Sequence, residues 1–134
     1  MSQNLFLYGT LLPSEAPKEI ASIVKRFRRL GSGHVRGKLY DFGEFPGAVV
    51  DPSSRTLIHG ELVTLPSDER ILQALDRYEE FDPTHPRKSL FLRKKALVRM
   101  ANGSVREGWI YVYNRNPGNA KLVRSGDYLR SKVA

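Results

Sequence analysis

Two neighbouring carboxylates in the middle of the chain, Glu79 and Glu80, are the first residues whose type and position suggest chemistry. On a helix with about 100° between residues, Glu79 falls between Leu72 and Leu75 on the apolar side, whereas Glu80 points away toward water. A carboxyl group in apolar surroundings loses hydration, which raises its pKa and lets it accept and donate a proton near neutral pH. Glu79 is therefore a candidate general acid and base.

A purely structural interpretation of Glu79 is equally consistent with the residues. The helix can fray before this position and turn the side chain outward, or the carboxylate can pair with one of the 22 lysines and arginines. Acidic side chains that face an apolar interior are uncommon unless they are paired or functional. The helical wheel alone leaves both interpretations open.

The loop Tyr8-Gly9-Thr10-Leu11 is the second candidate. It follows the apolar run Leu5 to Tyr8, which is typical of a strand buried on both faces. Consecutive N–H groups where such a strand ends can surround a carboxylate and bind it. A simple turn explains the same four residues, and these letters alone favour the turn, because glycine after a strand is common.

Helical spacing predicts two helices that would position these residues. The first has apolar residues at Ile20, Ile23, Val24, Phe27 and Leu30. Pro17 fits its first turn and Gly31 is available to stop it. The second helix is expected to begin at a Ser67 cap and to end near residues 79–82, before Pro83.

Further segments are predicted to be strands, at residues 34–42, 57–65, 90–100 and 105–113. Gly37 and Gly60 interrupt two of them, which suggests a bulge or a close approach of another backbone. Asn102-Gly103 predicts a tight hairpin turn between the last two, and alternation places Trp109, Tyr111 and Tyr113 on one face, as core or as pocket lining. The end of the chain is predicted to form either a short strand that closes the sheet or a tail. About six strands and two helices predict an α+β fold with a small, mixed, bent or barrel-like sheet.

Composition limits the remaining possibilities. The 134 residues, 40% of them hydrophobic, fit a single domain over residues 1–134. The absence of cysteine excludes disulfides, thiol nucleophiles and thiolate metal sites. The N-terminal apolar run is too short for a signal core or a membrane span, so we expect a cytoplasmic protein with no membrane association.

The basic composition, with 22 lysines and arginines against 14 acidic residues and a net charge of +8, raises nucleic acid as a partner. The basic stretches at residues 25–29 and 93–95 are interpreted as solvated surface, because no nucleic-acid-binding motif accompanies them. His34, His59 and His85 lie far apart in the sequence without the spacing of metal ligands, so no metal site is predicted.

Several motifs occur together in the order of one known family. They are Leu5–Leu11, then Gly33–Tyr40 followed by Phe45-Pro46-Gly47, then His59-Gly60-Glu61-Leu62, and finally Leu75-Asp76-Arg77-Tyr78-Glu79. Over about residues 4–113 the chain resembles the gamma-glutamylcyclotransferase-like family, particularly its small AIG2-like branch. The resemblance implies a small mixed barrel around a cavity.

The resemblance also implies a reaction. By motif position, the backbone of Tyr8, Gly9, Thr10 and Leu11 would hold a glutamyl group, and Glu79 would be the general acid and base. The α-amine of a small-molecule γ-glutamyl substrate would attack its own side-chain carbonyl, close 5-oxoproline and release the attached amine or peptide. No cofactor, metal or covalent intermediate is implied.

The chain departs from the family pattern at two positions. Glu80 stands where a glycine commonly follows the family glutamate, and its charge is expected to raise the pKa of Glu79. Phe91 stands where many relatives carry a tyrosine two residues before an arginine. Two other functions stay open: a module that binds a glutamyl-like carboxylate without turnover, and a basic nucleic-acid-binding protein.

Overall fold

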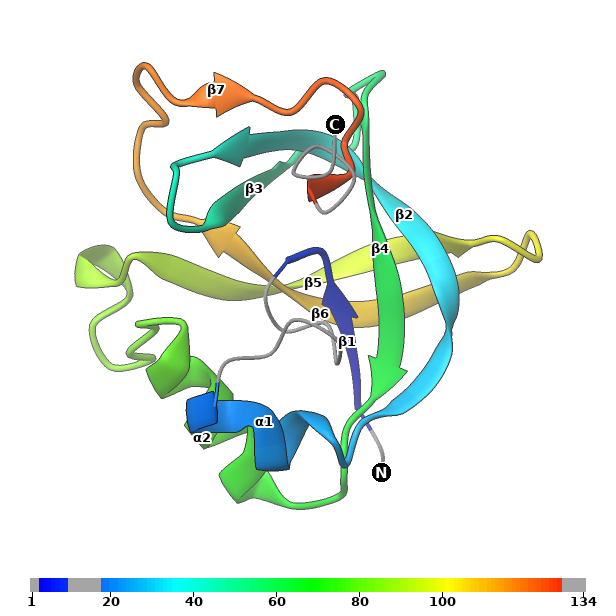
Figure 1. Ribbon diagram of the computed structural model, residues 1–134, viewed down its shortest axis with the longest axis vertical. Coiled ribbons are helices and arrows are strands. Elements are labelled where there is room, and N and C mark those ends of the chain that lie inside the picture. Colours follow the sequence, from blue (N-terminus) through cyan, green and yellow to red (C-terminus); the bar gives the residue numbers. More distant parts are fainter. Residues whose placement is uncertain (1–2, 10–17, 129–134) are drawn as a thin grey trace.

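The computed structural model describes residues 3–9 and 18–128, which form a strongly bent sheet with two helices gathered at one end (Figure 1). The elements in chain order are β1 (Asn4–Leu7), α1 (Lys18–Val24), β2 (Arg28–Asp41), β3 (Pro46–Val50), β4 (Leu57–Thr64), α2 (Glu69–Tyr78), the short 3₁₀ helix η1 (Pro86–Lys88), β5 (Phe91–Met100), β6 (Val105–Tyr113) and β7 (Lys121–Leu122).

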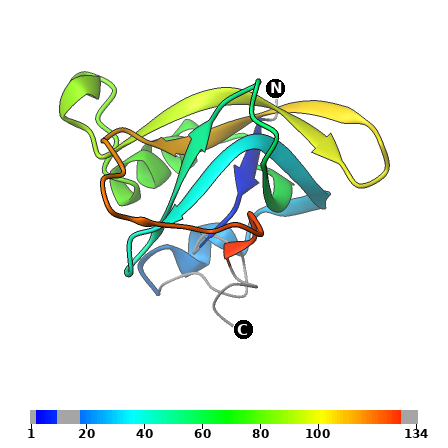
Figure 2. The same cartoon turned by 90° about the horizontal axis from the view of Figure 1, so that it is seen from above.

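The sheet closes on itself into a barrel. Its strand order is β3-β2-β4-β1-β6-β5, and a further pairing of β2 with β5 joins the ends of the five strands that form the barrel. β1 is antiparallel to β4 and parallel to β6, so the sheet is mixed. Seen from above, β2 and the β5–β6 hairpin are strongly curved (Figure 2). The predicted α+β fold with a bent, barrel-like sheet is confirmed.

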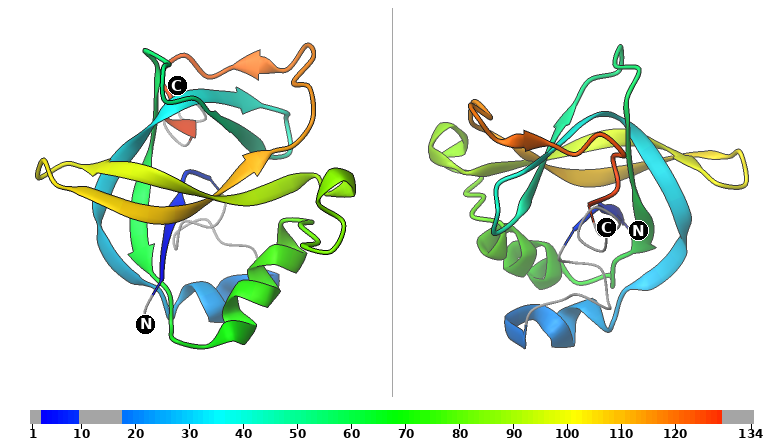
Figure 3. Two further views of the ribbon diagram at one scale, coloured as in Figure 1. Left: turned by 180° about the vertical axis from the view of Figure 1, so that it is seen from behind. Right: turned by 45° about the horizontal axis from the view of Figure 1, so that its top comes forward.

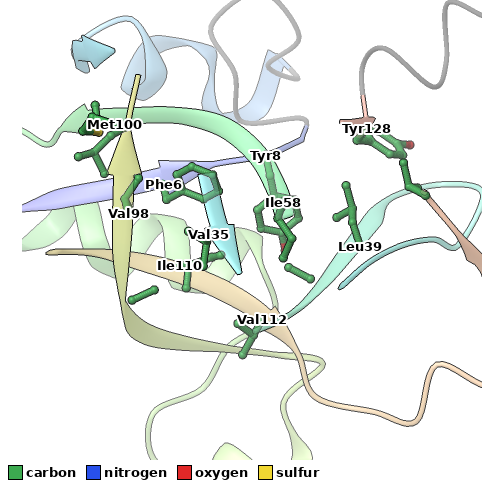
Figure 4. Packing of buried hydrophobic residues seen from close by; sticks show 14 residues of the cluster. Phe6, Tyr8, Val35, Leu39, Ile58, Val98, Met100, Ile110, Val112 and Tyr128 are labelled. Carbon is green, nitrogen blue, oxygen red and sulfur yellow. The ribbon is translucent and has the colours of Figure 1, made fainter. Parts of the chain in front are cut away.

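β1 lies between two parts of the core, which confirms the prediction of a strand buried on both faces. Phe6 points into the barrel, where it packs in the same cluster as Ile58 and Ile110 (Figure 4). Leu5 and Leu7 point to the opposite side and pack in the cluster beneath the helices. Leu5, Phe6 and Leu7 are each at most 2% exposed.

A close backbone approach at Gly60 draws β4 against β1, as the interrupted strand pattern predicts. A Cβ atom at this position would lie 2.1 Å from the main-chain oxygen of Leu7. No side chain fits in that space. β1 therefore ends in close contact with β4, which fixes the direction in which the chain leaves the strand toward Gly9.

The predicted first helix is wrong in its second half. α1 ends at Val24, and β2 begins at Arg28, so Gly31 lies inside a strand and does not end a helix. Residues 28–36 pair with β4 in a long antiparallel ladder instead of continuing the helix. Phe27 and Leu30 still pack against the core, but from a turn and a strand. Tertiary pairing has overridden a weak helical pattern here.

The other predicted boundaries differ by smaller amounts. Asp68, not Ser67, caps α2, and its side chain accepts a hydrogen bond from the Arg70 N–H. β3 is not predicted, and the end of the chain forms the short strand β7, which pairs with β2. The Asn102-Gly103 hairpin is confirmed by the hydrogen bond from the Met100 N–H to the Ser104 carbonyl, 2.8 Å long. No helix in residues 3–9 and 18–128 is long and apolar enough to span a membrane.

Candidate active site

The end of α2 sets the direction of the Glu79 side chain. The Glu79 N–H still donates to the Leu75 carbonyl, at 2.9 Å, so helical geometry extends one residue beyond Tyr78. The chain then reverses, with hydrogen bonds from the Glu80 N–H to the Arg77 carbonyl and from Phe81 to Asp76. This is the Schellman arrangement. Glu79 therefore keeps its place on the helical wheel and faces inward.

Glu79 lies at a small cavity between the end of α2 and the end of β1. We call this space the Glu79 cavity. It is lined by Glu79 together with Phe6, Leu7, Tyr8, Gly9, Phe45, Pro46, Phe91 and Tyr111. Except for Glu79 and the two tyrosines, these side chains are apolar. The structure thus brings the predicted carboxyl group and the first two residues of the predicted loop to one hollow.

The electrostatics of Glu79 follow from this position. Burial raises the pKa of Glu79 to about 7, and the nearby charge of Glu80 adds to the rise. Within the described part of the chain, no side chain or main-chain group forms a hydrogen bond or ion pair with the Glu79 carboxyl group. The group is therefore close to half protonated at neutral pH.

A second buried carboxylate, Asp76, lies one turn earlier on α2 and is fully partnered. Arg93 on β5 donates to both of its oxygens, at 2.8 and 3.1 Å, and the Tyr111 hydroxyl donates to one of them at 2.6 Å. The guanidinium of Arg93 also stacks over the Trp109 ring at 4.3 Å. We call Asp76, Arg93 and Tyr111 the Asp76 network; it joins α2 to the β5–β6 hairpin beside the Glu79 cavity.

The two tyrosines at the Glu79 cavity use their hydroxyl groups within the protein. The Tyr8 hydroxyl donates to the main-chain oxygen of Tyr111, while the Tyr111 hydroxyl donates to Asp76. Burial and the nearby charge of Glu79 raise the pKa of Tyr8 well above its usual value. Both phenols therefore stay protonated, and the cavity wall offers their rings.

Gly9 is buried where β1 ends, and Pro46 packs against it. A Cβ atom at Gly9 would lie 2.6 Å from the Pro46 side chain, so the contact leaves no room for a larger residue. The other two residues of the predicted loop, Thr10 and Leu11, lie outside the described residues. The structure therefore places Tyr8 and Gly9 of the predicted cradle beside Glu79.

The two departures from the family pattern have structural counterparts. Glu80 is exposed and occupies the left-handed region, with φ 55°, at the position where a Schellman turn favours glycine. Phe91 is 5% exposed, and its ring packs edge-on against Phe45 and Tyr113, each with centroids 5.7 Å apart. This position adds an apolar ring to the cavity wall and no hydroxyl group.

Sequence reasoning missed the Asp76 network. It interpreted Arg93 as part of a solvated basic stretch, but the Arg93 side chain is 16% exposed and paired with Asp76. A signal was available, because the wheel places Asp76 about 40° from Leu72, at the edge of the apolar face.

His34 and His59, distant in the sequence, lie side by side with ring centroids 5.9 Å apart. In the described residues no group of three or more His, Asp or Glu side chains could hold a metal ion.

Comparison with known proteins identifies the family. The model of the family described as gamma-glutamyl cyclotransferase, AIG2-like, matches residues 5–130. The chain belongs to this family. Its members among curated relatives include the Gamma-L-glutamyl-butirosin B gamma-glutamyl cyclotransferase of Niallia circulans, which is 32% identical over 114 residues, covering 84% of this chain and 68% of the relative. Family and relatives indicate gamma-glutamyl cyclotransferase-type activity.

Solved structures of the family share the fold. The family protein YtfP of Escherichia coli is 34% identical over 92 residues, which are 69% of this chain and 67% of YtfP. Its solution structure superimposes with a TM-score of 0.66, covering 97% of this chain and 99% of that one at 27% identity. YkqA of Bacillus subtilis has a TM-score of 0.73 at 22% identity over the whole chain. The chain spans 44% of YkqA, so this likeness concerns the fold alone.

Proposed function

We propose that this protein is a γ-glutamyl cyclotransferase that releases 5-oxoproline from a γ-glutamyl amine or peptide by intramolecular aminolysis. In this proposal Glu79 is the general acid and base. The backbone of Tyr8, Gly9, Thr10 and Leu11 holds the α-carboxylate end of the glutamyl group. The observation that carries the proposal is the Glu79 carboxyl group, which has a pKa of about 7 and no hydrogen-bond or ion-pair partner among the described residues, in a cavity lined by Tyr8 and Gly9.

The reaction needs one group that both takes and gives a proton. The α-amine nitrogen attacks the side-chain carbonyl carbon, a C–N bond forms, and Glu79 removes a proton from the attacking nitrogen. The original amide C–N bond then breaks, and Glu79 returns the proton to the leaving nitrogen. A pKa near the working pH suits both transfers, which contribute about 10² to 10⁴ in rate. No water is consumed, and no cofactor takes part in this scheme.

The apolar wall supports the same role. Phe6, Phe45 and Phe91 line the cavity and give part of its wall an apolar surface. Exclusion of water keeps the pKa of Glu79 high and restricts hydrolysis of the activated carbonyl. The Glu79 cavity has a volume of about 50 Å³, which is smaller than a glutamyl group, so the proposal requires it to widen when substrate binds. A glutamyl chain held folded there would have its amine next to its carbonyl, which adds a proximity contribution.

The test is 5-oxoproline release from a panel of γ-glutamyl amides, measured by mass spectrometry. The panel includes γ-glutamyl peptides, γ-glutamyl derivatives of simple amines and γ-L-glutamyl-butirosin B, the compound in the name of the Niallia circulans relative. We expect Glu79→Gln to fold normally and to lower turnover by about 10² to 10⁴. The matched control is Glu80→Gln, which removes the neighbouring exposed carboxylate and is expected to retain turnover.

Two results would contradict the proposal. Normal turnover by Glu79→Gln would remove the assigned role of Glu79. Ligand-dependent thermal stabilisation of the wild type without 5-oxoproline from any compound would instead favour a binding module on the same scaffold. A single domain over residues 1–134 and a cytoplasmic location stay predictions of the sequence.

A further inference from the structure

A second concave site lies where β2 and β5 separate in the barrel wall, and it shares no lining residue with the Glu79 cavity. It is a groove of about 490 Å³ between β2 and β5, roofed by the end of β3 and the turn after it. We call it the β5 groove. Its floor includes Val35 and Ala96, and Val50 closes one end.

The β5 groove exists because the barrel closes over a very short seam. β2 pairs with β5 only at Gly33 and His34, opposite Met100 and Arg99. From Gly37 onward, β2 pairs with β3 on that edge. The two strands therefore separate, and β5 continues away from β2 toward η1 (Figure 3).

The separation leaves one edge of β5 without a neighbouring strand. The Ala101 N–H donates to the Ser32 carbonyl, while the Met100 N–H donates to Ser104 on the β6 side. Because main-chain groups of an antiparallel strand alternate between its two edges, those of Leu97 and Lys95 point to the side of β2. No strand in the described part of the chain pairs with them there. Such an edge can pair with an added strand.

The outer face of the hairpin beside this edge carries two exposed apolar side chains among charged ones. Leu97 is 68% exposed and Val105 is 51% exposed, the two largest exposures among the big hydrophobic side chains of the described residues. Both line the β5 groove. Because side chains alternate between the faces of a strand, every second side chain of an added strand would lie on this outer face beside Leu97, and the others would face the buried Val35 and Ala96.

The charge of the β5 groove is positive. Arg36 and Arg99 line it from opposite walls, and neither has a carboxylate partner in the described residues. Lys95 also lines the groove, but its charge is offset by Glu107, 3.6 Å away. The Arg36 guanidinium is held in place by the carbonyl of Ser54, at 3.1 Å. Arg36, which is held in place, and the exposed Arg99 thus border an apolar floor without a carboxylate partner among the described residues.

We propose that the β5 groove binds an extended acidic segment of a partner polypeptide, which adds to β5 as a further strand. Its main chain would pair with Leu97 and Lys95. Its acidic side chains would lie on the outer face near Arg36 and Arg99, and its apolar side chains, on the opposite face of the added strand, would cover Val35 and Ala96. Cross-strand pairs of opposite charge and of apolar residues are the contacts that stabilise such an added strand.

Charge favours this occupant over a second copy of the same chain. Another molecule would bring a net charge of +8 and the same arginines to the edge, and like charges resist edge pairing. The apolar floor and the open main-chain edge also suit a polypeptide better than a phosphate backbone. Self-association and nucleic-acid binding are therefore alternative outcomes of the test.

The test measures fluorescence anisotropy with a labelled eight-residue peptide of alternating glutamate and valine. The comparison peptide has lysine in place of glutamate. Two further peptides carry N-methyl groups on either the odd or the even residues, since only one set of N–H groups can face β5. Protein variants are Arg36→Gln with Arg99→Gln, and the matched control Arg106→Gln, an exposed arginine of the same hairpin that does not line the groove.

We expect the acidic peptide to bind and the lysine peptide not to bind. One N-methylated peptide should lose binding while the other keeps it. The double arginine variant should bind about tenfold more weakly, and Arg106→Gln should match the wild type. Equal binding of both N-methylated peptides would overturn strand addition. So would the absence of binding at millimolar peptide, tighter binding of a single-stranded oligonucleotide, or a protein dimer that blocks the edge. None of these measurements depends on turnover at Glu79.

Discussion

Asp76 and Glu79 are carboxylates three residues apart on one helix end, both turned toward the interior, yet their surroundings differ in charge. Asp76 accepts hydrogen bonds from Arg93 and Tyr111, so its negative charge is compensated inside the protein. Glu79 lines the cavity without a paired cation among the described residues, and the charge that raises its pKa is that of another carboxylate, Glu80. The first carboxylate joins elements of the fold, whereas the second is available to exchange a proton.

The difference arises from the residues that the β5–β6 hairpin presents to each carboxylate. Arg93 and Tyr111 are cross-strand partners on β5 and β6, so both reach the same side of α2. That side carries Asp76, and the adjacent stripe that carries Glu79 meets apolar rings from β1 and β5. Burial next to a cation stabilises a carboxylate, while burial next to rings favours its protonated form. Substitutions of the two carboxylates and of their charged neighbours test this comparison.

The largest stability effect is expected for Asp76. Asp76→Ala leaves the Arg93 guanidinium, which is 16% exposed, without its carboxylate and the Tyr111 hydroxyl without its acceptor. Removal of one partner of a buried ion pair typically costs about 3–5 kcal/mol. Urea unfolding at pH 7 measures the change in the free energy of unfolding.

The control is the double variant Asp76→Leu with Arg93→Met, which removes both charges together. Because the desolvation cost of the pair also disappears, this variant is expected to be more stable than Asp76→Ala. A loss below about 1 kcal/mol for Asp76→Ala would show that the network is as weak as an exposed ion pair.

Substitution of Glu79 is expected to raise the free energy of unfolding, whereas substitution of Asp76 lowers it, and the effect of Glu79 is expected only at high pH. Its pKa is about 7 in the folded protein against 4.5 without burial, so between these values the folded state keeps a proton that the unfolded chain has released. Stability therefore falls as the pH rises through this window. Glu79→Gln should be more stable than the wild type at pH 8, by up to about 3 kcal/mol, and similar near pH 4.

Thermal or urea unfolding of both proteins across pH 4–8 measures this difference. Glu80→Gln is the control, because it leaves Glu79 in place and should retain most of the pH dependence. Parallel stability curves for Glu79→Gln and the wild type would mean that the Glu79 carboxyl group is hydrated in the folded state.

The sequence alone predicts the parts of the site that depend on local patterns, but it does not predict those that depend on contacts between distant segments. The direction of Glu79 follows from spacing on a single helix, and the buried β1 from an unbroken apolar run. The Asp76 network depends on the register of β5 against β6 and on the crossing of α2 over that hairpin, which no local pattern encodes. The end of α1 was mispredicted for the same reason, since the ladder between residues 28–36 and β4 is a distant pairing.

The next prediction concerns the backbone under the Glu79 cavity. Glu80 adopts a left-handed conformation, with φ 55°, that costs a residue with a side chain roughly 1 kcal/mol more than glycine. Glu80→Gly should therefore raise the free energy of unfolding by about 1 kcal/mol. Glu80→Ala keeps the unfavourable conformation and removes the same charge, so the difference between the two variants isolates the backbone. Equal stability of Glu80→Gly and Glu80→Ala in urea would contradict this explanation.

The smallest expected effect is on the pH dependence of turnover, and it tests how the two halves of the Glu79-Glu80 pair act on each other. Turnover in the proposed mechanism requires deprotonated Glu79, so the rate should fall as the pH drops below about 7. Because the Glu80 charge raises the pKa of Glu79, Glu80→Gln should move this acidic limb to lower pH, by about half a unit.

Glu80 is exposed, so its effect passes partly through solvent and should shrink in about 1 M salt. Rate profiles of 5-oxoproline release at low and high salt measure both effects. An acidic limb that stays in place at low salt would assign the raised pKa of Glu79 to burial alone.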